Sequence, residues 1–572
     1  MMENMNNLKN YLHQATKALG YEKPRPFLEY VAEKMRDSKL LVAEAPTGYG
    51  KTTLSMAFAL NAILGEGLKA IVTYPLRSLL EQQLSRFRSV YTRLGFDDRI
   101  VGARYMGHAE APYLIRPVTL TTIDTLSLTA LGLPPEDIDK AVKKFRGFSH
   151  YSMGHYLFSR AMFSLSWLVL DEVHLLVDST KSLSFLIALL RLASINDQRV
   201  LMLSATIPKA MMEILKRETK VEFIRFNEKM DQEFLADRRR KKYCVHIEAL
   251  NNDWSDCIYI WLRNGLKERE KAIIVFNTVE RAIRFYEKIV ASNHELKVNR
   301  NEILLLHSRF MESDRKDKIK KLDEGKWRIL ITTQVIEAGV DISSDLFITE
   351  LAPANSLVQR LGRFLRREGE EDGEVYVWYD KKAIKGANKN KGGKYTVYDI
   401  DLVRETLLAL ENRAKINFHD PRSYQIILDE VYREDYYMVN RKYIGEVNTA
   451  YFQLNRIKYV VDLFLEEAEG SFIRENTIAP VVTKEISIRE LEDIVKAVLP
   501  LGLDLVHKYL MGYLRIDEEK HVVFKEIDGS KVKRKDLLKI SLNPGFLAFV
   551  INGTYDQEKG LLLKRGEINE SS

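Results

Sequence analysis

A chain of 572 residues is too long for a single hydrophobic core, so we expect about three domains. Its 46% hydrophobic and 29% charged residues are typical of a globular protein, and its formal charge of +7 is compatible with a nucleic-acid partner without requiring one. Two cysteines, Cys244 and Cys257, exclude a disulfide framework and match no zinc spacing, while the lack of a secretory signal and of any apolar run near ~20 residues predicts a cytoplasmic protein without a membrane segment.

Short apolar runs alternate with longer amphipathic stretches over the first two-thirds of the chain, a pattern typical of parallel sheets covered by helices. The first predicted strands are 40–43, 70–73, 118–120, 167–170 and 199–203. This alternation of apolar and amphipathic stretches stops at the basic run 238–242 and begins again after it. The second set of predicted strands is 272–276, 303–306, 328–331, 346–349 and 374–378. Each set predicts one α/β domain.

A stretch rich in Gly, Lys and Asn, 385–394, predicts a linker or mobile loop. Helical periodicity follows over 399–413, 422–433 and 486–498, with short strand-like pieces such as 521–525 near the end. We therefore predict three units. They are residues 1–230, residues 231–384 and a mostly helical C-terminal accessory domain over residues 385–572.

The segment 41–53 predicts a strand, a glycine-containing loop and the start of a helix. The glycines let backbone amides turn inward and cradle the triphosphate of ATP at the helix N-terminus, where the helix dipole favours anions. Lys51 would reach the β- and γ-phosphates, and the Thr52 hydroxyl would ligate Mg²⁺. The residues assigned to nucleotide binding here are Ala45, Pro46, Thr47, Gly48, Tyr49, Gly50, Lys51, Thr52 and Thr53.

An acidic pair, Asp171 and Glu172, follows the predicted strand 167–170. Asp171 can hold Mg²⁺, and Glu172 can orient and deprotonate the attacking water. An acidic pair after a strand is often only a solvated loop. The segment 428–431 carries the same letters on a predicted helix, and we interpret it as surface charge. The predicted strand before Asp171 distinguishes the two segments.

With these two motifs placed, the chain resembles the superfamily 2 DExH helicases over residues 20–380. The resemblance implies an α/β fold of two tandem RecA-like domains with parallel sheets, and ATP and Mg²⁺ as cofactors. It implies that His174 and the run Ser204, Ala205 and Thr206 couple hydrolysis to domain movement. The segment 359–366 resembles motif VI, in which Gln359 meets the attacking water and Arg363 and Arg366 act as fingers on the γ-phosphate.

Other segments resemble the motifs with which these helicases hold nucleic acid and nucleotide. They are motif Ia at 73–79, motif Ib at 121–124, motif IV at 276–278 and motif V at 332–341. Hydroxyls, amides and arginines at strand ends can hold phosphates without reading bases. The residues assigned to nucleic-acid binding are Arg77, Thr121, Thr122, Asn277, Ser308, Arg309, Thr332 and Thr333. Gly339 and Asp341 are assigned to the nucleotide. Leu28 stands where the resemblance predicts an adenine-reading Gln, so adenine specificity is not implied.

Three features resemble the CRISPR-associated helicase of type I interference systems: DEVH paired with the sequence LHSRF at 306–310, the run TTQVIEAGVDIS, and motif VI as QRLGRFLRR. This resemblance implies the displaced single strand of target DNA and a CRISPR effector complex as partners. The phosphate loop begins within fifty residues of Met1, and His419–Asp420 is typical of a turn or helix cap. We therefore expect a stand-alone helicase subunit whose HD nuclease is a separate polypeptide.

Two rival functions remain open. One is a general DNA-repair or RNA helicase of the same superfamily. The other, of a different class, is a nucleic-acid-binding scaffold with a spent ATPase site. The scaffold would require the loss of Lys51, Glu172 or Arg363, and all three are present.

Overall fold

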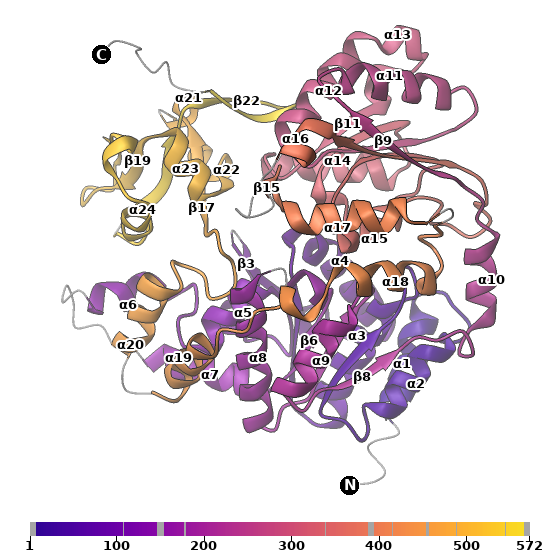
Figure 1. Cartoon of the computed structure of the whole chain (residues 1–572). Helices are drawn as coiled ribbons and strands as arrows, with labels where there is room; N and C mark the ends of the chain where they lie inside the picture. The colour runs from indigo at the N-terminus through magenta and orange to yellow at the C-terminus, as the bar shows by residue number, and fades with distance from the viewer. Residues whose placement is uncertain are drawn as a thin grey trace.

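The computed structural model describes residues 7–106, 108–145, 154–176, 179–337, 339–386, 394–413, 416–453, 457–487, 489–543 and 545–564. Two α/β lobes lie one above the other, and a C-terminal unit stands beside them (Figure 1). The predicted linker 385–394 falls mostly outside the described residues.

The first lobe is built on an eight-stranded sheet with the order β4-β3-β5-β2-β6-β7-β1-β8. Its pairs are parallel, except that β4 runs antiparallel to β3. The strands are β1 (Leu40–Glu44), β2 (Lys69–Tyr74), β3 (Val101–Tyr105), β4 (His108–Ala109), β5 (Val118–Thr122), β6 (Ser166–Leu170), β7 (Val200–Ser204) and β8 (Glu222–Arg225). Helices bury both faces, which is why β1 is apolar at every position from 40 to 43.

The second lobe is built on a six-stranded, wholly parallel sheet with the order β11-β12-β10-β13-β14-β9. The strands are β9 (Val245–Leu250), β10 (Ala272–Val275), β11 (Ile303–Leu306), β12 (Ile329–Thr332), β13 (Leu346–Glu350) and β14 (Glu374–Asp380). All ten predicted strands are therefore confirmed. The edge strand β9 was missed because its side chains are mostly half-buried or exposed, so it lacks a continuous apolar run.

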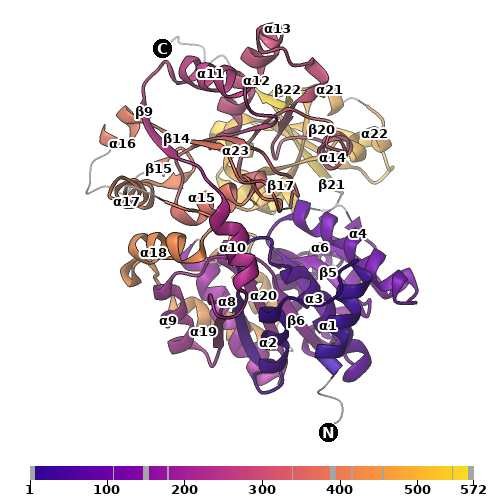
Figure 2. The ribbon, with the colours of Figure 1, turned by 90° about the vertical axis from the view of Figure 1, so that its right-hand side faces the viewer.

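The helices of the first lobe are α1 (Asn7–Ala18), α2 (Pro26–Lys34), α3 (Lys51–Leu60), α4 (Arg77–Arg93), α5 (Ile123–Ala130), α6 (Ile138–Phe145), α7 (Gly154–Ser164), α8 (Thr180–Ile195) and α9 (Lys209–Glu218). The second lobe carries α11 (Trp254–Gly265), α12 (Val279–Ala291), α13 (Asn293–Leu296), α14 (Glu312–Asp323), α15 (Ala354–Leu361) and α16 (Lys381–Gly386). Figure 2 shows α10 (Gln232–Arg240) running between the two lobes. No helix in the described ranges is long and apolar enough to cross a membrane.

The C-terminal region begins with the short strands β15 (Lys394–Tyr395) and β16 (Tyr398–Asp399), followed by α17 (Ile400–Glu411), α18 (Pro421–Val431), α19 (Arg441–Phe452) and α20 (Ile457–Asp462). Then comes a five-stranded sheet of order β18-β17-β21-β19-β20, followed by a hairpin. These strands are β17 (Ile478–Thr483), β18 (Leu499–Gly502), β19 (Leu510–Ile516), β20 (Val522–Glu526), β21 (Phe546–Ile551), β22 (Gly553–Asp556) and β23 (Gly560–Leu563). The helices among them are α21 (Lys484–Ser487), α22 (Leu491–Lys496), α23 (Leu503–Tyr509) and α24 (Arg534–Ser541). The sequence predicted the early helices, but the tail contains more sheet than we expected.

The C-terminal unit is tied to both lobes. On the first lobe, the Arg474 guanidinium donates to both carboxylate oxygens of Asp124 in α5, at 2.9 and 2.8 Å, and to the carbonyl of Pro75. On the second lobe, His307 and the carbonyl of Lys559 in the hairpin turn lie 3.0 Å apart, and Tyr555 accepts a hydrogen bond from the Met311 amide. Figure 1 shows the hairpin reaching the second lobe.

Candidate active site

The phosphate loop joins the end of β1 to the start of α3. Gly50 precedes the helix with φ of 92°, a left-handed conformation that favours glycine. The loop is fixed from behind by the Ala45 amide, which donates to the carbonyl of Ser204. Lys51 is buried, and its Nζ donates to the carbonyl of Ala45 at 3.0 Å. The structure therefore holds the lysine inside the loop that it was predicted to serve.

Asp171 and Glu172 lie at the end of β6, in the same sheet. Asp171 is buried, and its carboxylate accepts a hydrogen bond from the Glu172 amide at 2.9 Å. Burial, followed by the charge of Glu172, raises the pKa of Asp171 well above its usual range, while Lys51 opposes the shift. A divalent cation held between Asp171 and Thr52 would favour the ionised carboxylate.

His174 connects this acidic pair to the segment 204–206. Its Nδ1 lies 2.9 Å from the Ser204 hydroxyl, and Ser204 also bonds to the amide and carbonyl of Thr206. Burial lowers the pKa of His174 to about 4, so the ring is neutral near pH 7. The predicted coupling residues thus form one contiguous group, together with Ala205, which is buried in the same turn.

Motif VI meets the first lobe across a closed cleft. The Gln359 amide lies 3.5 Å from the Thr206 hydroxyl, and a Cβ on Gly362 would lie 3.1 Å from the Thr47 hydroxyl. In motif V, a Cβ on Gly339 would lie 2.7 Å from the backbone nitrogen of Leu79, so only glycine allows this approach. The two lobes therefore stand in contact along the predicted motifs.

The predicted arginine fingers are held by motif V. Arg363 donates to the carbonyls of Ile336 and Glu337, at 3.1 and 3.2 Å. Arg366 forms an ion pair with Asp341 at 3.0 Å, and Asp341 also pairs with Arg86 of α4 at 2.9 Å. Asp341 was assigned to the nucleotide. In the structure it bridges the lobes.

Arg360 is a functional residue that the sequence analysis missed. Its fully buried guanidinium forms an ion pair with Glu337 at 2.8 Å and donates to Asn277 and Tyr398. A buried arginine is costly unless it is paired and hydrogen-bonded, and this one is. It joins motifs IV, V and VI into one unit. Its place among the apolar residues Leu357, Val358 and Leu361 was the signal that could have revealed it.

Among the buried atoms without a hydrogen-bond partner in the described residues are three on predicted site residues: Oε2 of Glu172, Nε2 of His174 and Nη1 of Arg366. The His174 Nδ1 approaches Glu172 Oε2 only to 3.4 Å. Buried polar atoms are normally satisfied, so such a cluster indicates a polar ligand. A triphosphate with Mg²⁺ and an attacking water provides acceptors for the arginine and a donor for the carboxylate. The residues present therefore fit this cofactor.

The predicted nucleic-acid contacts fall into two groups. The side chains of the first group are buried and donate hydrogen bonds within the protein. Thr121 donates to the carbonyl of Arg104, Asn277 to that of Leu351, Thr332 to that of Leu306, and Arg309 to the carboxylate of Glu280. Thr333 is also buried. Ser308 is exposed, and Thr122 is half-buried and caps α5. The accessible residues are therefore the ones best placed to touch a strand.

Arg77 lies in a charged cluster that crosses the cleft. It pairs with Glu81 at 2.8 Å and with Glu312 of the second lobe, and it stacks over Tyr105. Arg315 of the second lobe pairs with Glu81 at 2.9 Å. A strand phosphate that binds Arg77 would therefore compete with these carboxylates.

Leu28 is buried, and it would lie 3.6 Å from a Cβ on Gly50. Next to it, the Phe27 amide donates to the Tyr49 hydroxyl, which donates to Asp231 at 2.9 Å. An apolar side chain therefore stands where a base-reading amide was expected, beside the phosphate loop.

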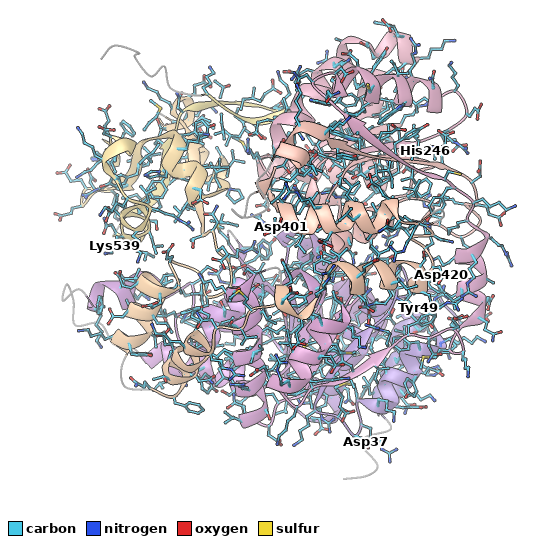
Figure 3. The ribbon with its side chains drawn as sticks, in the orientation of Figure 1. Asp37, Tyr49, His246, Asp401, Asp420 and Lys539 are labelled. Carbon is cyan, nitrogen blue, oxygen red and sulfur yellow. The ribbon has the colours of Figure 1, made fainter. Side chains whose placement is uncertain are left out.

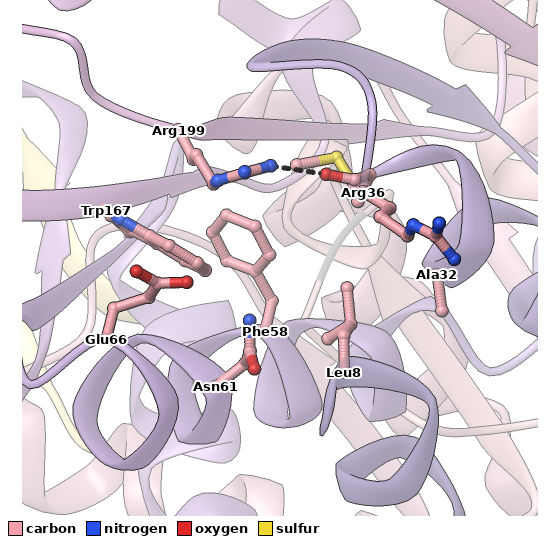
Figure 4. A pocket seen from close by; sticks show the side chains of 9 residues that line it. Leu8, Ala32, Arg36, Phe58, Asn61, Glu66, Trp167 and Arg199 are labelled. Atoms are coloured by element: carbon pink, nitrogen blue, oxygen red, sulfur yellow. Dashed lines mark hydrogen bonds between the residues drawn. The ribbon is translucent and has the colours of Figure 1, made fainter. Parts of the chain in front are cut away.

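A small cavity of about 20 Å³ lies apart from the cleft (Figure 4). It is lined by residues that include Leu8, Phe58, Trp167 and Arg199, and the Arg199 guanidinium donates to the Met35 carbonyl at 2.5 Å. It has room for about one water molecule. None of the predicted site residues lines it.

His419 and Asp420 have structural roles. Asp420 caps α18 by accepting from the Arg422 amide, which confirms the predicted cap. His419 lies 2.7 Å from the carbonyl of Phe364 in motif VI and 3.0 Å from the Tyr243 hydroxyl. Asp420 also accepts from Arg239 of α10, while Asp231 at the start of α10 binds Tyr49. Asp420 and Tyr49 are labelled in Figure 3. The doublet of His419 and Asp420 therefore supports the loop that carries the arginines.

Neutral His419 predicts a loss of stability in acid. Burial, followed by the charge of Arg238, lowers its pKa to about 3, whereas an unfolded histidine takes up a proton near 6.5. Its contribution is complete above pH 6.5 and is lost as the pH falls. Between pH 7.5 and pH 5 we expect the free energy of unfolding to drop by about 2 kcal/mol more in the parent than in His419→Gln. Denaturant titration measures this, with the exposed His294→Gln as control. Equal pH dependence in the parent and His419→Gln would contradict the assignment.

Two family models match separate parts of the chain. Residues 26–214 match the DEAD/DEAH box helicase, and residues 268–369 match the C-terminal part of the CRISPR-associated nuclease/helicase Cas3. The CRISPR-associated nuclease/helicase Cas3 of Methanothermobacter thermautotrophicus is 24% identical over 60% of this chain and 42% of its own length. The CRISPR-associated helicase Cas3 of Thermoproteus tenax is 25% identical over 60% of this chain and 56% of its own. The chain thus spans about half the length of these curated relatives.

Solved structures share the fold. The crystal structure of T. fusca Cas3 is 17% identical, covers 96% of this chain and 72% of its own, and has a TM-score of 0.63. A chain of a CRISPR RNA-guided surveillance complex, pre-nicking, is 18% identical over 94% of this chain and 70% of its own, with a TM-score of 0.56. The family matches make the two lobes similar to superfamily 2 helicases of the DEAD/DEAH-box class, and the solved structures share the fold. Among these helicases, the chain is similar to the CRISPR-associated helicase Cas3.

Proposed function

We propose that the chain is an ATP- and Mg²⁺-dependent DNA helicase or translocase of type I CRISPR interference, which unwinds target DNA by moving along the displaced single strand. The observation that carries this proposal is the meeting of two half-sites across one cleft. Lys51 and Glu172 come from the first lobe, and Arg363 and Arg366 come from the second. Hydrolysis therefore depends on closure of the cleft.

Each side chain has a step that it can perform. Lys51 and the loop amides hold the phosphates, and Glu172 can accept the proton of the attacking water. Mg²⁺–ATP, when bound, supplies the transferable phosphoryl group and the charge of the metal. Arg363 and Arg366 can neutralise the charge that develops on this group only while the lobes are in contact. A single strand lying across both lobes favours the closed state and so raises the rate.

The proposed partners are a CRISPR effector complex and a separate HD nuclease subunit. The first is supported by the similarity to a chain of a surveillance complex and by the relatives named Cas3. The second follows from the sequence resemblance; His419 and Asp420 serve the motif VI loop and the start of α18. The strand would be cut by the partner after this chain has unwound it.

The test compares ATP hydrolysis without nucleic acid and with single-stranded DNA, duplex DNA or single-stranded RNA. We expect single-stranded DNA to raise the rate on the order of tenfold or more, because it shifts the population toward the closed state. Unwinding of a tailed duplex should require ATP, and strand cleavage should appear only after an HD nuclease is added.

The outcomes separate the rival functions. Stimulation by RNA alone would favour an RNA helicase, and the absence of hydrolysis under all conditions would favour a binding scaffold. Metal-dependent cleavage by the chain alone, lost in His419→Ala, would overturn the proposal of a separate nuclease. Equal rates with and without a strand would refute coupling through closure.

A further inference from the structure

One arginine outside the predicted motifs reaches the phosphate loop. Arg238 belongs to α10, the helix between the lobes. Its residue is only 7% exposed, and its Nη2 donates to the carbonyl of Thr47 at 3.3 Å. The same nitrogen would lie 2.9 Å from a Cβ on Gly48. The guanidinium stacks over Phe234, 5.0 Å from the ring centre.

Arg238 is a buried cation without an acidic partner. In the described parts of the chain, no carboxylate oxygen lies within 4.0 Å of its guanidinium, whereas its neighbour Arg239 pairs with Glu228 and Asp420. Burial lowers the pKa of Arg238; the charge of Asp237 opposes this shift, and the nearby Arg366 adds to it. A buried charge is normally paired, because removing it from water is costly. The guanidinium of Arg238 therefore lacks a directly bonded counter-charge.

We propose that Arg238 is a further nucleotide-contacting residue, which binds the terminal phosphates from the connection between the lobes. This inference rests on the proposed function as an ATPase. A phosphate in the loop would supply the missing counter-charge, and the planar fork of arginine suits two phosphate oxygens. The arginine stands where the phosphate loop and motif VI meet, since a Cβ on Gly362 would lie 3.1 Å from the Thr47 hydroxyl.

The position of Arg238 would make α10 sensitive to the nucleotide. Three residues further on, Lys241 is buried, and its Nζ donates to the carbonyls of Arg367 and Glu370 at 3.0 and 2.9 Å. These carbonyls lie just after the finger Arg366. One short segment therefore touches both the phosphate loop and the finger loop.

The experiment uses the full chain and three variants: Arg238→Met, Arg238→Lys and the control Arg240→Met. Arg240 is exposed on the same helix. Calorimetric titration with Mg²⁺ gives the dissociation constants of ATP and AMP, and thermal melting gives the stability without nucleotide. We expect Arg238→Met to weaken ATP binding about ten- to hundredfold and to leave AMP binding nearly unchanged. Arg238→Lys should lose less, and Arg240→Met should match the parent.

Melting distinguishes a ligand contact from a structural role. Removing an unpaired buried charge should leave the melting temperature of the nucleotide-free protein unchanged or higher. Parent-like ATP affinity in Arg238→Met, or equal weakening of ATP and AMP, would overturn the inference. If Arg238→Met fails to fold, a parent-like affinity for ATP in Arg238→Lys would overturn it. If the parent and Arg240→Met bind no ATP, the proposed function itself fails.

Discussion

Replacing Arg363 with alanine should abolish strand-stimulated ATP hydrolysis and leave binding of single-stranded DNA largely intact. The guanidinium is buried in the cleft, where it donates to the carbonyls of Ile336 and Glu337 in motif V. In the proposed mechanism it acts on the phosphate and not on the strand. An arginine finger contributes roughly 10³ or more to the rate, so we expect a loss of that size in the presence of DNA.

The measurement is hydrolysis with and without single-stranded DNA, together with strand affinity by fluorescence anisotropy. The matched control is Arg367→Ala, which removes an exposed arginine from the same loop. Unchanged stimulation in Arg363→Ala would remove Arg363 from the site. Parallel loss of strand binding and hydrolysis would indicate that the arginine supports the cleft without acting on the phosphate.

Replacing Glu172 with glutamine should nearly stop turnover while ATP still binds. Glutamine keeps the shape of the side chain but cannot take the proton of the attacking water. General bases contribute on the order of 10²–10⁴ to the rate, and we expect a loss in this range. Lys51→Ala should differ, because it removes the positive charge inside the phosphate loop and should weaken ATP binding as well.

Single-turnover hydrolysis and ATP titration separate the two effects. Glu430→Gln is the control, because residues 429–431 repeat the letters of 171–173 on α18, where Glu430 is exposed and pairs with Arg413. Near-normal turnover in Glu172→Gln would show that another group is the base. Normal ATP affinity in Lys51→Ala would remove the lysine from phosphate binding.

The sequence predicted the parts of this fold that are encoded locally. The ten predicted strands were recognised by their short apolar runs, and the phosphate loop and the acidic pair follow two of them directly. The strand β3 was missed although it is buried at every position, because Gly102 and Arg104 interrupt its apolar run. Motif VI was recognised because it is a contiguous stretch of sequence as well. The closed geometry places these motifs in contact, as the contact between Gln359 and Thr206 illustrates.

Long-range pairing could not be predicted from local patterns. Arg360 has its meaning only because Glu337, Asn277 and Tyr398 surround it, from three separate parts of the chain. The internal hydrogen bonds of Thr121 and Thr332 depend on neighbouring strands. In the C-terminal sheet the predicted strand-like piece 521–525 is β20, but the extent of the sheet was underestimated because it depends on pairing between distant segments, such as β17 with β21.

The attachment of the C-terminal unit to both lobes has a mechanical consequence. The lobes are joined by α10, and also through Arg474 on Asp124 at one side and the hairpin 553–563 on Met311 at the other. Two lobes joined only by α10 could rotate freely relative to each other. A C-terminal unit attached to both lobes limits this rotation. If the cleft between the lobes opens further than the C-terminal unit allows, the ion pair of Arg474 must break or the hairpin must leave the second lobe. In the proposed translocase, this double attachment would limit how far the lobes separate in each cycle.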